Sequence, residues 1–86
     1  MSGQWRLVFD EEAFEYLLSR RARERNLLIG FLTKLKADPY QEPEYTINDD
    51  TGRPLQVKTF RPYLITYWLD HSVLEVRVLE IERIRS

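Results

Sequence analysis

Residues 55–81, LQVKTFRPYLITYWLDHSVLEVRVLEI, decide the fold of this 86-residue chain. Runs of β-branched and aromatic residues that are bounded by turn residues are typical of strands. Three segments fit this description, at 55–60, 63–69 and 73–81. The turns between them fall at Arg61-Pro62 and at Asp70-His71-Ser72. The stretch therefore predicts a three-stranded antiparallel β-meander.

The last of these strands has two different faces. Leu74, Val76 and Val78 alternate with Glu75 and Arg77. Because successive side chains of a strand point to opposite faces of the sheet, we expect the three apolar residues to pack on a core and the charged ones to face water.

Upstream of the meander the pattern changes from strand to helix. Residues 5–9 alternate as in a short strand, and Asp10 then stands where an N-cap belongs. A helix is predicted from there to about Arg20. Four apolar residues form its inward face, namely Ala13, Phe14, Leu17 and Leu18.

A second helix follows the arginine-rich segment 20–23, which we interpret as the connection between the two helices. Its apolar rhythm is Leu28, Phe31, Leu32 and Leu35, with Leu27 beside it. Asp38-Pro39 ends it, because proline disfavours helix for the residue before it. Residues 40–52 have two prolines nearby, are rich in acids and end in an Asp-Asp-Thr-Gly turn, so they are predicted to form a long loop that leads into the sheet.

The predicted fold class is α+β in the order β-α-α-β-β-β. The apolar faces of the two helices and of the sheet must each be buried away from water. We therefore expect a small, mostly antiparallel sheet with a two-helix hairpin packed on one face. Residues 1–86 suffice for a single domain. The opposite face of the sheet is predicted to be free and to hold the functional side chains.

Composition excludes several classes of site. The chain has no cysteine and one histidine, so neither a disulfide framework nor structural zinc is expected. Three glycines cannot build a phosphate-binding loop. No apolar run approaches the roughly 20 residues that span a bilayer, and the first residues lack the pattern of a secretory signal, so the cytosol is the expected location.

Basic and aromatic residues of the meander are the remaining candidates for chemistry. They are Lys58, Arg61, Tyr63, Tyr67, Arg77, Arg83 and Arg85. Guanidinium and ammonium groups that converge on one face can bind a phosphodiester and stabilise the charge that grows during phosphoryl transfer. Aromatic rings beside them can stack on an unpaired base. The alternative interpretation is an ordinary solvated surface, on which lysine and arginine protect exposed strand edges from aggregation.

Three stretches together resemble the RelE/ParE superfamily of toxins from bacterial toxin–antitoxin pairs. They are FDEEAFEYL at 9–17, LKADP at 35–39 and the run from Leu55 to Ser86. The resemblance implies a toxin that is held by a cognate antitoxin in a hetero-oligomer. In the RelE branch it implies an endoribonuclease that cuts messenger RNA on the ribosome, without metal or other cofactor, and so inhibits translation.

The resemblance also assigns roles to residues. Lys58 on the first meander strand is similar to the family's basic residue that stabilises charge or transfers a proton. Arg61 and Arg83 match its two arginines and complete the expected catalytic set. Arg77, Arg85 and Tyr63 are expected to contact RNA.

Two departures from the RelE pattern leave alternatives open. Gln56 stands where a second lysine is usual, and the chain ends at Ser86 without the usual terminal tyrosine, for which Tyr63 or Tyr67 is a potential substitute. The alternatives are a ParE-like inhibitor of DNA gyrase and a catalytically inactive protein-binding module of the same fold.

Overall fold

The computed structural model describes residues 4–85. Its elements are β1 Arg6–Phe9, α1 Glu11–Ser19, α2 Ala22–Ala37, β2 Tyr45–Asn48, β3 Pro54–Phe60, β4 Tyr63–Asp70 and β5 Glu75–Arg83. The strands form one five-stranded sheet in the order β1-β5-β4-β3-β2. β1 runs parallel to β5 and all other neighbours are antiparallel. The predicted α+β class is confirmed, and the sheet is mixed because β1 joins it in parallel.

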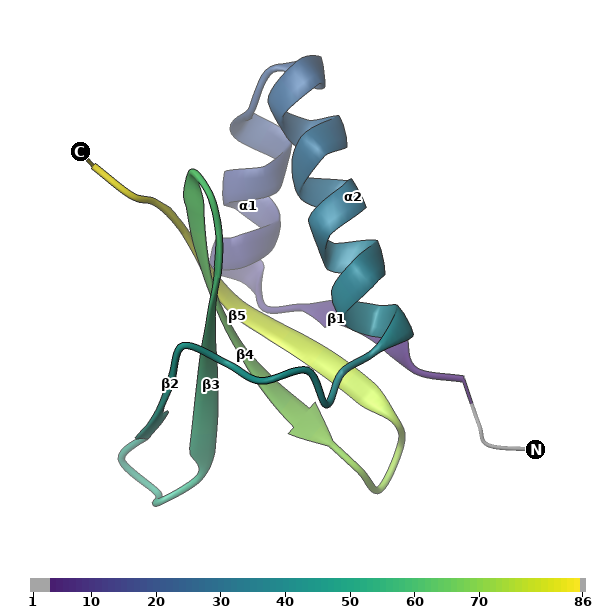
Figure 1. Cartoon of the computed structure of the whole chain (residues 1–86), viewed down its shortest axis with the longest axis vertical. Coiled ribbons are helices and arrows are strands. Elements are labelled where there is room, and N and C mark those ends of the chain that lie inside the picture. The colour runs from purple at the N-terminus through teal and green to yellow at the C-terminus, as the bar shows by residue number, and fades with distance from the viewer. Residues whose placement is uncertain (1–3, 86) are drawn as a thin grey trace.

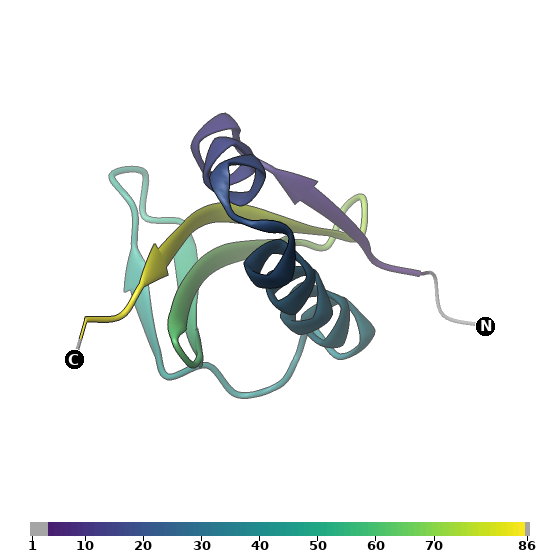
Figure 2. The same cartoon turned by 90° about the horizontal axis from the view of Figure 1, so that it is seen from above.

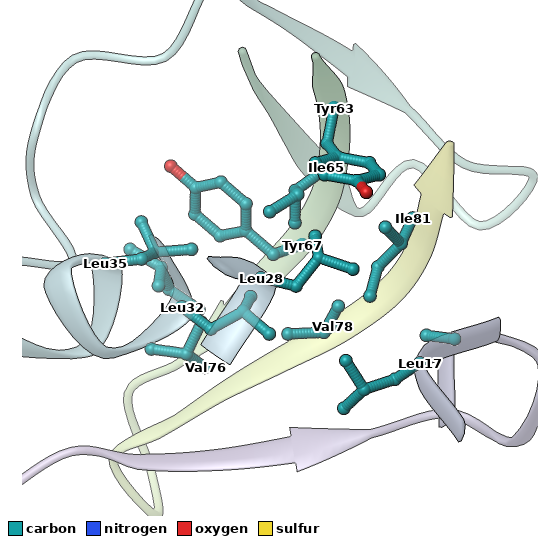
Figure 3. Packing of buried hydrophobic residues seen from close by; sticks show 12 residues of the cluster. Leu17, Leu28, Leu32, Leu35, Tyr63, Ile65, Tyr67, Val76, Val78 and Ile81 are labelled. Atoms are coloured by element: carbon teal, nitrogen blue, oxygen red, sulfur yellow. The ribbon is translucent and has the colours of Figure 1, made fainter. Parts of the chain in front are cut away.

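Both helices lie on the same side of the sheet (Figure 1). Their buried residues meet the sheet in one apolar cluster, shown in Figure 3, that draws on α1, α2, β4 and β5. Its members are Ala13, Leu17, Leu28, Leu32, Leu35, Tyr63, Ile65, Tyr67, Leu69, Val76, Val78 and Ile81. The predicted helix pair on one face is therefore present. Neither helix in the described part of the chain is long and apolar enough to cross a membrane.

The inward face of α1 is narrower than predicted. Ala13 and Leu17 are buried, whereas Phe14 and Leu18 are 46% and 56% exposed. The expectation that all four pack inward was wrong, because a helix that meets the sheet along one line covers only the side chains on that line.

α2 begins earlier than the sequence pattern indicated. Arg21 is its N-cap residue with an extended backbone, and Ala22 and Arg23 are already helical. The connection between the helices is thus shorter than the predicted segment 20–23. Leu28, Leu32 and Leu35 are fully buried as expected, while Leu27 stays 45% exposed.

The predicted loop 40–52 contains a strand. Tyr45–Asn48 forms β2 and pairs antiparallel with β3. The turn that joins them is held by the Asp49 carboxylate, which accepts hydrogen bonds from the Thr51 and Arg53 backbone amides, both at 2.9 Å. Gly52 closes it with a φ of 84°, a conformation that favours glycine.

The turn between β4 and β5 extends to Leu74, whose φ is 54°. This left-handed conformation takes Leu74 out of the strand, so β5 starts at Glu75. The prediction that Leu74 packs with Val76 and Val78 on the core face was wrong for Leu74, which is half-buried outside the core cluster.

Candidate functional site

Lys58 and Arg83 lie on the helix side of the sheet. Residues directly opposite each other on antiparallel strands share a face. Lys58 is opposite Ile65, and Arg83 is opposite Tyr63; both partners belong to the core cluster. The expectation that these bases occupy the free face was therefore wrong, since both lie on the face of the sheet that carries the helices.

A β-bulge in β5 puts Arg83 on this side. Tyr67 is opposite Val78, but the preceding residue, Thr66, is opposite Glu80, so Leu79 has no partner on β4. The extra residue shifts the alternation of the strand by one. As a result Ile81 and Arg83 point to the helix side together with Val78, although strict alternation from Val78 assigns them to the other face.

Arg83 is held by a carboxylate from the first turn of α2. Its Nη1 lies 3.5 Å from Glu24 Oε2, and the Tyr63 hydroxyl donates a hydrogen bond of 2.8 Å to the same oxygen. Burial, followed by the hydrogen bond to Glu24, raises the pKa of Tyr63. The Arg83 side chain remains 58% exposed, so its other guanidinium nitrogens are accessible to a ligand.

Arg61 and Arg85 belong to the same end of the molecule. Arg61 lies in the exposed turn between β3 and β4. Directly after it, the Pro62 carbonyl accepts a 2.7 Å hydrogen bond from the Ile84 amide. This bond ties the segment that carries Arg83 and Arg85 to the turn that carries Arg61.

Lys58 lies farther along the same face. Its Nζ donates a 2.8 Å hydrogen bond to the Glu42 carbonyl, in the connection between α2 and β2. Lys58 on β3 is opposite Ile65 on β4, which is opposite Ile81 on β5, so two strand spacings separate Lys58 from Ile81. Arg83 is two residues farther along β5. The two Cα atoms are thus roughly 12 Å apart, given strand spacings of ~4.8 Å and a rise of ~3.3 Å per residue. Long basic side chains at this separation can approach the same phosphodiester.

A groove of about 690 Å³ opens between α1 and the end of β5. Its basic residues are Arg20, Arg83 and Arg85. The Arg20 guanidinium lies 4.5 Å from the centre of the Tyr16 ring, which also lines the groove. Three carboxylates, those of Glu12, Glu80 and Glu82, line it as well. The groove is therefore of mixed charge.

Arginines from the helix connection were not assigned a functional role from the sequence. Arg20, Arg21, Arg23 and Arg25 lie within four residues of Glu24 along the chain, and Glu24 contacts Arg83 and Tyr63. The signal was four arginines within six residues, which we had interpreted only as a connection. We call these four together with Arg61, Arg83 and Arg85 the arginine end; it holds seven of the 13 basic residues of the chain.

Two of the predicted RNA contacts are not placed with this group. Arg77 is opposite Trp68 on the other face, and its guanidinium pairs with Asp10 at 3.4 Å and Glu75 at 3.3 Å. Tyr63 is 1% exposed, so its ring is covered by protein and not open to a base. Tyr67 is fully buried, and burial raises its pKa to about 12. Both phenol rings are therefore enclosed by the protein.

Among residues 4–85, no group of three histidine, cysteine, aspartate or glutamate side chains is arranged to hold a metal ion. The chemistry that this end offers is that of guanidinium and ammonium groups, which bind phosphate by charge-assisted hydrogen bonds.

Comparisons with models of protein families and with curated proteins found no match to this sequence. Solved structures do match. The toxin–antitoxin complex RelBE2 from Mycobacterium tuberculosis has a TM-score of 0.75 at 15% identity, over 94% of this chain and 99% of that chain. The isolated Escherichia coli RelE toxin has a TM-score of 0.74 at 17% identity, over 95% and 86%.

An archaeal RelE–RelB complex from Pyrococcus horikoshii OT3 has a TM-score of 0.72 at 14% identity, over 94% of this chain and 96% of that chain. At these identities the likeness is one of fold. It extends over nearly the whole length of the chains compared, and the predicted RelE-like fold is confirmed.

Proposed function

We propose that this chain is the toxin of a toxin–antitoxin pair and acts as a RelE-like endoribonuclease that cuts messenger RNA on the ribosome. One observation carries the proposal. On a RelE-like fold, Lys58, Arg61, Arg83 and Arg85 lie toward one end of the sheet, on or beside its helix side.

The proposed reaction is cleavage by the RNA's own 2′-hydroxyl. Its oxygen attacks the adjacent phosphorus in line, the bond to the 5′-oxygen breaks, and the products are a 2′,3′-cyclic phosphate and a 5′-hydroxyl. The proton lost by the 2′-hydroxyl is balanced by the one that the leaving oxygen gains. The protein has to stabilise the charge on the phosphoryl oxygens, which positioned cations do well.

Each basic residue has a place in this scheme. Arg83 binds the phosphoryl oxygens, with Glu24 fixing one side of its guanidinium. Lys58 stabilises charge or takes part in proton transfer once its Nζ leaves the Glu42 carbonyl. Arg61 and Arg85 contact neighbouring phosphates. Arg77 and Tyr63 are left out, because one faces the other side of the sheet and the other is buried.

The decisive experiment is induced expression of the chain and of Arg83→Ala in bacteria, with translation rate and the 5′ ends of ribosome-bound messenger RNA as readouts. We expect new 5′ ends with the wild type and a loss of cleavage rate of roughly 10²–10³-fold in Arg83→Ala, as for removal of one group that stabilises the transition state. Arg6→Ala is the matched control, because Arg6 pairs with Glu75 on the opposite face.

Intact messenger RNA and normal translation at full accumulation of folded wild type would overturn the proposal. If purified protein then blocks supercoiling by gyrase, the ParE-like alternative holds. If it affects neither process, the chain is a binding module of this fold.

An antitoxin is the proposed partner, and the outer faces of the helices offer it apolar surface. Phe14 and Leu18 are one turn apart on α1, and Leu27 and Ile29 are each 45% exposed on α2. So small a core gains from a partner that covers such residues. Co-expression with the product of an adjoining short reading frame should neutralise the toxin, and Leu18→Asp should weaken that neutralisation. Equal neutralisation of both forms places the partner elsewhere.

A further inference from the structure

The strand β2 is an edge that lacks a neighbour on its outer side in the described part of the chain. It is the last strand of the sheet and pairs only with β3. All four of its residues, Tyr45–Asn48, are exposed. Figure 2 shows it on the far side of β3 from the helices. Such an edge offers unpaired backbone groups to another chain.

The register shows which backbone groups point outward. The Asp49 amide donates to the Arg53 carbonyl at 3.0 Å, which makes residues 49 and 53 a hydrogen-bonded pair. Hydrogen-bonded and non-bonded pairs alternate along an antiparallel ladder. Tyr45 and Ile47 therefore bond to β3, whereas Thr46 and Asn48 direct their N–H and C=O groups away from it. Asn48 is opposite Pro54, which has no N–H to donate.

Apolar side chains flank these outward groups. Tyr45 is 50% exposed and Ile47 is 44% exposed, and both lie on the sheet face opposite the helices, because Tyr45 is opposite Val57 and Val57 is opposite Thr66. Aromatic and β-branched residues pair favourably with apolar neighbours on an added strand. The edge therefore combines main-chain groups with two apolar positions at alternate residues, the arrangement used in β-strand addition.

Charge decides what kind of strand fits. Residues 38–50 carry five acids and no base. Of these, Glu42, Glu44 and Asp50 are exposed and form no ion pair with any described residue. A second copy of this chain would bring the same acids against themselves. A strand that carries lysine or arginine would instead meet opposite charges at short range.

We propose that the outer edge of β2 docks an extended basic segment of another protein, which adds to the sheet as a sixth strand with apolar side chains against Tyr45 and Ile47. The site does not use the arginine end, so it goes beyond the function proposed above and is tested independently of it.

The probe is a fluorescein-labelled peptide of alternating lysine and valine, and the readout is fluorescence anisotropy with the full chain. We expect saturable binding that weakens with added salt. A matched peptide of alternating glutamate and valine should not bind. A lysine–valine peptide with N-methylated backbone amides should not bind either, because it cannot donate to the Thr46 and Asn48 carbonyls.

Thr46→Pro is the variant that isolates the edge. It removes an outward N–H and leaves the bonds of Tyr45 and Ile47 to β3, and proline is tolerated on an edge strand in this orientation. We expect at least a tenfold loss of peptide affinity. Gly30→Ala on α2 is the control, because an added Cβ meets nothing within 4 Å; its affinity should equal that of the wild type.

Glu44→Lys is the second variant and keeps the test decisive if Thr46→Pro does not fold. It should lower the affinity for the lysine–valine peptide severalfold and raise that for the glutamate–valine peptide. Absence of binding, equal binding of both peptides, or unchanged affinity in a folded Thr46→Pro each overturns the proposal. So does a wild-type dimer that Thr46→Pro or Glu44→Lys abolishes, since the edge would then be occupied by a second copy.

Discussion

The arginine end and the β2 edge carry opposite charge and are held together in opposite ways. The arginine end draws residues from the helix connection, a hairpin turn and the end of β5, and Glu24 links two of these parts through Arg83 and Tyr63. The β2 edge is one segment that pairs with its sequence neighbour β3. A net charge of −1 therefore conceals a basic surface built by tertiary contacts and an acidic one built locally.

Weakening the packing of α2 should have the largest effect, because α2 supplies three fully buried leucines to the core and carries Glu24, which pairs with Arg83 of the arginine end. Leu28→Ala removes a fully buried side chain of α2 and should lower the free energy of unfolding by about 2–5 kcal/mol. Leu27→Ala is the matched control one residue away, at a side chain that is 45% exposed, and should change it by about 0.5 kcal/mol or less. Urea unfolding measures both. Equal losses would mean that α2 packs on a different face.

The second effect appears at alkaline pH and concerns Tyr67, a member of the buried core (Figure 3). Burial raises its pKa to about 12, so the folded protein holds the phenol neutral while the unfolded chain ionises it near pH 10. The corresponding stability is fully present below pH 10 and is lost as the pH rises toward 12. The loss amounts to about 2–3 kcal/mol for two pKa units.

Tyr67→Phe should remove this contribution. Plots of unfolding free energy against pH should therefore fall less steeply between pH 10 and 12 for the variant than for the wild type. Parallel curves would show that ionisation of Tyr67 does not drive the alkaline loss of stability.

The sequence predicted the fold because its strongest signals are local and repeated. The meander, the helix pair and their order follow from alternation in strands and from helical spacing of leucines such as Leu28, Leu32 and Leu35. The four-residue strand β2 was not predicted, because it lies among acids and prolines, which are also typical of loops. Its pairing with β3 depends on the turn that Asp49 holds.

The role of the chosen site residues stays a prediction, but their placement can be compared with the sequence pattern. The fold brings Lys58, Arg61, Arg83 and Arg85 toward one end, and Lys58 and Arg83 lie on the face opposite to the one expected. Alternation from Val78 puts Arg83 on the free face, and one unpaired residue, Leu79, reverses that assignment. The sign of the bulge in the sequence is that strict alternation from Val78 would bury Glu80 and Glu82 and expose Ile81, and the register of β4 and β5 shows which residue is extra. The same shift separates Arg83 from Arg77, which alternation alone places together.

The smallest effect should come from the hydroxyl that anchors the arginine end. Tyr63→Phe removes the donor to Glu24 and should cost about 1 kcal/mol at pH 7, because the carboxylate is partly exposed and water can replace the phenol. The Tyr67 hydroxyl is buried and has no partner among the described residues, so Tyr67→Phe should be neutral or slightly stabilising at the same pH. Two variants that each delete one oxygen from a buried tyrosine thus differ in sign or size, and denaturant unfolding at pH 7 resolves them. The reverse order, with Tyr67→Phe the more costly, would show that the contact between Glu24 and Tyr63 does not hold the arginine end in place.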